Sequence, residues 1–156
     1  MKFLIKYFLW IIAVMVGGST WAQTPLFYKE IDIDARQCLL INNFEVARSE
    51  ADLQKLPLKR NAECESVDFG KINFSKNTLL LCNQYVHNGE EGIKSSRIEV
   101  LKNDRTKRIE VYFATFGSMS IQRQGQIFEY RKYLLVPKFP DDYKVEVNYS
   151  IHVVVP

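Results

Sequence analysis

The sequence has few of the residues that build metal, redox and nucleophilic sites. It contains 2 histidines, His87 and His152, and 3 cysteines, none of which stands in a C-x-x-C pair. A zinc or redox site needs closer cysteine spacing or more histidine partners. Ser118 follows Gly117, but it lacks the G-x-S-x-G setting of a hydrolase nucleophile. We therefore expect no catalytic residue, no metal site and no cofactor.

A hydrophobic run long enough to cross a membrane is also missing. The apolar stretch at residues 7–16 is shorter than the roughly 20 residues that a transmembrane helix needs. Lysines precede this stretch, and small residues in the segment 20–22 suit cleavage before Gln23. We interpret residues 1–22 as a cleaved secretory signal peptide and residues 23–156 as a single domain. An uncleaved membrane anchor is the alternative interpretation.

A strong charge of either sign is absent as well. The chain carries 21 Lys and Arg against 18 Asp and Glu, and two of the lysines, Lys2 and Lys6, lie in the expected signal peptide. The mature chain would therefore be almost neutral, whereas a nucleic-acid surface calls for a basic patch. We expect no nucleic-acid partner and no stable membrane insertion after cleavage. The expected location is the periplasm or the outside of the cell.

The clearest positive signal is the alternation of apolar and polar residues. Every second residue is apolar over residues 143–155, and the same period recurs over residues 109–121 and 128–136. Successive side chains of a strand point to opposite faces, so this pattern buries one face and wets the other. Such strands are typical of antiparallel sheets. In residues 78–86, apolar residues occur at both odd and even positions. This pattern predicts a strand that is covered on both faces.

One stretch of the mature chain predicts a helix. Ser49 can accept a hydrogen bond from a free backbone N–H of a first helical turn, where Glu50 and Asp52 suit the helix dipole. Pro57 ends the helix, which we place at residues 49–56. The expected fold class is therefore α+β, a mostly antiparallel β-sheet with one short helix. A small barrel-like sheet is the alternative.

Two hairpins are expected. The first joins residues 98–101 to residues 109–112 around a bend at Asn103-Asp104. The second turns at Gln124-Gly125 and pairs the two alternating segments that flank it.

The second hairpin defines a candidate partner-binding patch. Its register places Phe116 opposite Tyr133 and Ser118 opposite Arg131, on the face that the alternation predicts to be exposed to solvent. We single out Phe116, Arg131 and Tyr133 as partner-binding residues. The alternative is that the aromatic pair serves only sheet stability.

The cysteine count restricts the disulfides. Cys38, Cys64 and Cys82 are an odd number, so at least one thiol stays unpaired within a monomer. We expect at most one intramolecular disulfide and a buried third thiol. The sequence does not choose the pair.

Several motifs in a fixed order resemble a known group. A capped helix start at residues 49–53 leads to I-N-F-S-K-N-T-L-L-L at residues 72–81, and L-L-V-P-K follows at residues 134–138. The segment 41–147 thereby resembles a group of small exported bacterial proteins of unknown function, whose core typically reads D-F-S-K-x-T-L-L. More distantly it is similar to the C-terminal domain of accessory proteins that stabilise a secreted protease complex. The resemblance implies an exported α+β domain with no assigned reaction.

The functional hypothesis is an exported, non-catalytic binding or accessory module whose partner is another envelope or secreted protein. It depends on the missing catalytic motifs and on an aromatic-rich sheet, because rigid aromatic side chains suit recognition surfaces. The alternatives are a structural envelope-associated protein and a hydrolase.

Overall fold

The structure is a computed structural model that describes residues 23–33, 38–58, 64, 69–88, 93–118 and 126–154. The expected signal peptide lies outside the described residues, so its cleavage stays a prediction. The extent of the domain over residues 23–156 also stays a prediction.

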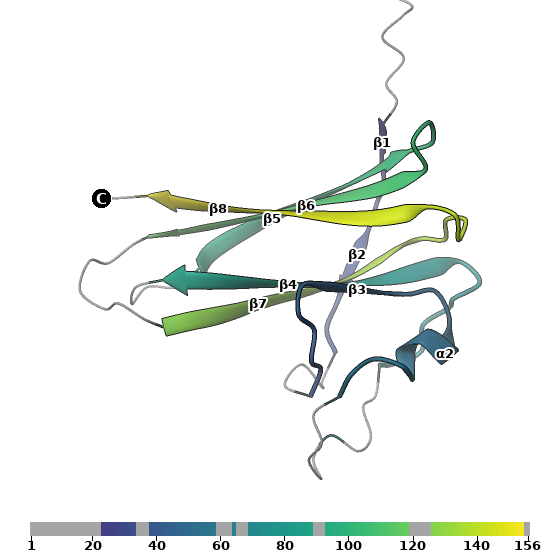
Figure 1. Cartoon of the computed structure of the whole chain (residues 1–156), viewed down its shortest axis with the longest axis horizontal. Coiled ribbons are helices and arrows are strands. Elements are labelled where there is room, and N and C mark those ends of the chain that lie inside the picture. The colour runs from purple at the N-terminus through teal and green to yellow at the C-terminus, as the bar shows by residue number, and fades with distance from the viewer. Residues whose placement is uncertain are drawn as a thin grey trace, which may run out of the picture.

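The described residues form two four-stranded sheets and one short helix (Figure 1). The strands are β1 Gln23–Pro25, β2 Lys29–Ile31, β3 Phe44–Ala47, β4 Asn77–Asn88, β5 Ile93–Asn103, β6 Arg108–Ser118, β7 Gln126–Pro137 and β8 Lys144–Val154, and the helix is α2 Glu50–Leu53. The first sheet has the order β1-β5-β6-β8, and the second has the order β2-β7-β4-β3. The expected mostly antiparallel sheet with one short helix is confirmed. The barrel-like alternative is wrong, because neither sheet closes on itself.

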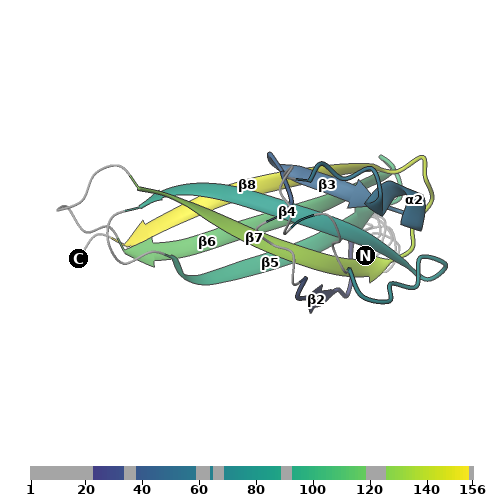
Figure 2. The ribbon, with the colours of Figure 1, turned by 90° about the horizontal axis from the view of Figure 1, so that it is seen from below.

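The two sheets pack face to face around an apolar core, and in Figure 2 the strands β4 and β7 cross in front of the first sheet. The inward-facing residues of β4, β5, β6 and β7 supply most of the core, and Val145, Val147 and Tyr149 of β8 pack against it, as the alternation predicts for β6 and β8. The buried members are Leu80, Cys82, Val100, Ile109, Val111, Phe113, Leu134, Val136, Phe139 and Tyr143.

A third layer covers part of the second sheet on its other side, below β3 and β4 in Figure 1. This outer layer consists of residues 31–33, 38–41, 49–58, 64 and 69–74. Its apolar side chains pack against Leu79, Leu81 and Tyr133. Since Leu80 and Cys82 face the inter-sheet core, β4 is buried on both faces, as its sequence predicts.

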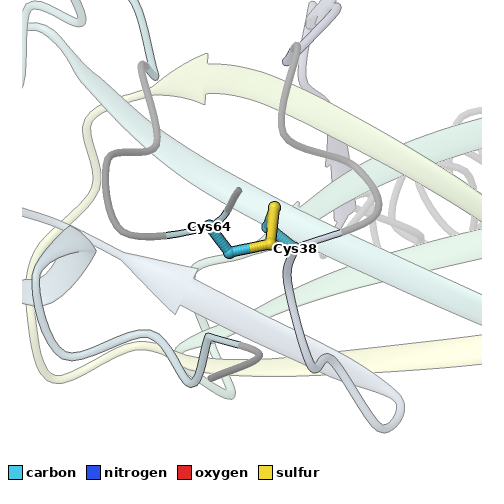
Figure 3. Close-up of a disulfide and its surroundings, with 2 residues drawn as sticks. All are labelled: Cys38 and Cys64. Carbon is cyan, nitrogen blue, oxygen red and sulfur yellow. A yellow bond between two sulfur atoms is a disulfide. The ribbon is translucent and has the colours of Figure 1, made fainter. Parts of the chain in front are cut away.

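A disulfide joins two parts of the outer layer (Figure 3). Cys38 and Cys64 are bonded with a Cα–Cα distance of 5.3 Å, and Cys82 is a free, buried cysteine. The prediction of at most one intramolecular disulfide and a buried third thiol is confirmed. A disulfide of this kind is compatible with an oxidising compartment.

The cap of α2 follows the sequence prediction. The backbone N–H of Asp52 donates to Ser49 Oγ at 3.2 Å, and the Asp52 carboxylate accepts from the backbone N–H of Arg48 at 2.9 Å. The helix is shorter than residues 49–56, because it ends at Leu53 and the chain continues as a turn.

The first hairpin is confirmed, with β5 antiparallel to β6 and Ile98 opposite Phe113. The second hairpin is wrong. β6 pairs with β5 and β8, whereas β7 pairs with β2 and β4 in the other sheet. Alternation decides which face of a strand is buried, but strands in two facing sheets share that pattern, so it cannot decide which strands are neighbours.

The last strand also departs from the expected antiparallel arrangement. β8 lies parallel to β6, with Val147 opposite Val111. The chain enters the second sheet as β7 and returns as β8, so the two strands that flank this passage run in the same direction. Parallel neighbours need such a crossover connection.

Candidate functional site

Phe116 lies apart from the other two residues of the predicted patch. It stands in β6 of the first sheet, opposite Ser95 of β5 and His152 of β8. Its half-buried ring stacks on His152 with the ring centroids 4.9 Å apart and the ring planes at 15°.

Tyr133 and Arg131 lie in β7 of the second sheet. Tyr133 is 0% exposed and packs under the outer layer, opposite Leu81. The Arg131 guanidinium is 2.5 Å from the Glu129 carboxylate, and its side chain is 8% exposed. The pairing of Phe116 with Tyr133 is therefore wrong, and the three side chains do not form one surface.

A polar network surrounds Arg131 at the border of the outer layer. Asn83 Nδ2 donates to the carbonyl oxygen of Ile41 at 2.6 Å and to Glu129 Oε1 at 3.2 Å. Burial and a hydrogen bond to Glu129 raise the pKa of Tyr85 in the same network. These bonds hold the outer layer against the second sheet, so we assign the network a structural role.

A different region has the features of a recognition site. On one side of the sandwich the first sheet ends at β8 and the second ends at β3. β3 has 4 residues, whereas β4 has 12 and β8 has 11. Figure 2 shows β3 beside only the part of β4 near α2. In the described part of the chain, residues 84–88 and residues 147–154 thus have no strand neighbour on this side. We call these two segments the open flank.

The open flank lacks the features that normally protect a sheet edge. Residues 84–88 and 147–154 contain no Lys, Arg, Asp, Glu or Pro. The opposite flank carries charges on residues 93–99 of β5 and on residues 126–132 of β7, and β5 has a register shift between Ile93 and Ser95. Charged residues and bulges discourage the addition of a further strand. Only one of the two flanks is therefore protected.

Ile151 lies where the second sheet no longer covers the inward-facing side chains of β8. Val145, Val147 and Tyr149 pack against the core, and Ile151 lies on the same face of β8. Yet Ile151 is 47% exposed. β3 begins opposite Cys82 and runs from there toward Leu79, so it does not extend along residues 84–88 of β4 to cover this side chain. An exposed apolar side chain on the inward phase leaves a site for an apolar residue of a partner.

The two sheets are bridged beneath the open flank by polar contacts. Gln84 Nε2 donates to the carbonyl oxygen of Ser150 at 3.2 Å. The other amide atom, Gln84 Oε1, has no hydrogen-bond partner among the described residues, although Gln84 is only 4% exposed. A buried acceptor without a donor is costly, so a donor supplied by a bound partner would stabilise it.

A groove continues the open flank toward α2. It lies between β3 and β8 and has a volume of about 390 Å³. Aromatic and aliphatic side chains line it together with two basic and two acidic residues: Phe44, Val46, Arg48, Asp141, Tyr143, Lys144, Val145 and Glu146. The groove thus combines apolar side chains with charged side chains of both signs.

Other site types find no support in the described residues. No group of three or more His, Cys, Asp or Glu side chains lies close enough there to hold a metal ion. Over the same residues, no helix has the length and apolar character needed to cross a bilayer.

Comparison of the chain with protein-family models, with curated proteins and with solved structures finds no match. The residues missed from the sequence are Asn148, Ser150 and Ile151. Their signal, an uncharged run without proline at residues 147–154, is readable in the sequence. It becomes informative only once β8 is known to be an edge strand.

Proposed function

We propose that the protein is an exported binding module that takes up an extended segment of another exported protein along the open flank. The observation that carries this proposal is the uncharged outer edge of β8 over residues 147–154. An edge strand offers a row of backbone N–H and C=O groups that an added strand can pair with.

Side chains around this edge would supply specificity. In strand addition the backbone contributes affinity, and pockets for alternate side chains select the sequence. The exposed side of Ile151 and the side chains of Phe44 and Val46 in the groove suit apolar residues of the added segment. A charged segment would place unpaired charges beside these side chains, so the favoured partner segment is uncharged.

Export is supported by two independent observations. The sequence predicts a cleaved leader at residues 1–22, and the Cys38–Cys64 disulfide is compatible with an oxidising compartment. A binding role outside the cytoplasm would also bring the open flank together with other exported chains rather than with nascent cytoplasmic ones.

The test is capture of exported proteins with two matched variants. Ile151→Lys places an inward charge in the open flank, and Tyr112→Lys is the control, because Tyr112 is 40% exposed on the outer face of β6. We expect the wild type and Tyr112→Lys to capture the same exported protein and Ile151→Lys to lose it, with melting temperatures within a few degrees of each other. Undiminished capture by Ile151→Lys, or no exported protein captured by the wild type, would contradict the proposal.

A further inference from the structure

The outer edge of β8 is complementary to itself. Two identical strands that pair about a two-fold axis run antiparallel, and each residue then contacts its symmetry counterpart on the other copy. Charged residues of β8 are confined to one end, at Lys144 and Glu146, while residues 147–154 are uncharged. Two copies of β8 can therefore pair without bringing acidic side chains together or basic side chains together.

Strand length selects the register. With the two-fold axis at Tyr149, the middle residue of β8, residue 144 of one copy lies opposite residue 154 of the other and Asn148 lies opposite Ser150, so all of β8 is paired. With the axis at Asn148, residues 153 and 154 of each copy would have no opposite residue in β8. Because each further residue pair adds backbone hydrogen bonds, the register about Tyr149 is the favoured one.

The same register covers the exposed apolar side chain. Ile151, 47% exposed in the single copy, lies opposite Val147 of the second copy on the inward phase. The pair would also satisfy the outward backbone groups of both strands. Each copy thereby protects the edge that its own short β3 leaves uncovered.

We infer that, when no partner is bound, two copies of this chain pair through β8 and join their first sheets into one continuous sheet. The inference rests on the proposed function in one respect, that the open flank accepts an added strand. Because the second copy and a partner segment would use the same backbone groups, self-pairing and partner binding exclude each other.

The experiment combines mass with register-specific cross-linking. Light scattering on the full chain should give twice the monomer mass, and that mass should fall to the monomer value on dilution. For cross-linking, Asn148→Cys and Ser150→Cys chains are mixed and oxidised. Directly opposed strand positions lie within disulfide reach, whereas positions offset by two residues do not. Cys82 is buried and Cys38 and Cys64 are bonded, so the new thiols report the contact.

We expect the mixed chains to form a covalent dimer and each single variant alone to form much less. Ser95→Cys mixed with Asn148→Cys is the control on the opposite flank and should give none. A monomer mass at every concentration, or equal cross-linking in all mixtures, would overturn the self-pairing. That result would leave the capture experiment with Ile151→Lys standing as the separate test of partner binding. Preferential cross-linking of Asn148→Cys with itself would overturn the register.

Discussion

The Tyr149 hydroxyl accepts a hydrogen bond from the backbone N–H of Asn83 at 3.3 Å, and this contact ties the edge strand β8 to the second sheet. The same hydroxyl donates to the carbonyl oxygen of Asn43, just before β3 begins. Burial raises the pKa of Tyr149 well above its ordinary value. Tyr149 thus closes the sandwich at the point where β3 starts, and the open flank begins beyond it.

Removing this hydroxyl should cost a modest amount of stability. Tyr149→Phe loses two hydrogen bonds, but the Asn43 carbonyl still accepts from the Asn83 N–H at 2.7 Å. We expect the free energy of unfolding to fall by about 0.5–1.5 kcal/mol in urea titration. Tyr112→Phe, which removes an exposed hydroxyl bond to Glu110, is the control and should change little. Equal effects of the two variants would argue against a closing role for Tyr149.

Tyr133 and Phe116 should respond very differently to truncation. Tyr133 is 0% exposed under the outer layer, so Tyr133→Ala should lower the free energy of unfolding by about 3–5 kcal/mol. Phe116 is half-buried and stacks on His152, so Phe116→Ala should cost only about 1 kcal/mol. Chemical denaturation of both variants checks the difference. A small loss for Tyr133→Ala would show that the outer layer does not bury this ring.

The contrast between these residues shows what alternation can and cannot predict. The phase of Phe113 and Val111 in β6 follows from the sequence, because a period of two decides which side chains share a face. The neighbour of β6 does not follow, since β7 has the same period but belongs to the other sheet. Tyr133 alternates with the inward-facing Leu134 and Val136, so the pattern alone predicts that its side chain is exposed to solvent. Only the outer layer, which has no periodic pattern, buries it.

The sequence shows the uncharged composition of the candidate site, but it does not show that the site lies at the edge of a sheet. The uncharged run at residues 147–154 is visible in the sequence, yet an uncharged strand in the middle of a sheet would need no partner. The site arises because β3 begins only opposite Cys82 and leaves residues 84–88 of β4 unpaired on this side, while β8 continues to Val154. Strand order and the unequal lengths of β3 and β8 are set by tertiary packing, which local pattern does not encode.

The thiol of Cys82 should be inert in the folded protein. Burial raises its pKa to about 12, so almost no reactive thiolate forms at pH 8. A maleimide or disulfide reagent should label no cysteine in the native chain and one cysteine after denaturation without reduction. Rapid labelling of the native chain would contradict the burial of Cys82 between the sheets.

Stability should depend on the ionisation of Asp52 at acidic pH. The hydrogen bond from the Arg48 backbone N–H holds the Asp52 pKa below its ordinary value in the folded chain. Because the folded pKa is the lower one, the contribution is present above the unfolded pKa of about 3.9 and is lost as the pH falls through the folded value. Asp52→Asn should therefore lower the melting temperature at pH 7, and the difference should shrink at acidic pH.

Glu50→Gln provides the comparison, since it changes the neighbouring carboxylate in the same helical turn without touching the contact to Arg48. Its effect on the melting temperature should be smaller at pH 7. A difference between Asp52→Asn and the wild type that persists unchanged at low pH would exclude ionisation of Asp52 as its source.

The central claim, that the outer edge of β8 accepts an added strand, is tested most directly by amide hydrogen exchange along β8. Outward amides of residues 147–154 should exchange fast in dilute protein and slowly in the concentrated protein or in the complex with a captured partner. The amides of β6, which pair on both sides with β5 and β8, should exchange slowly under all conditions. Equal protection of residues 147–154 in the dilute and the associated protein would contradict the claim.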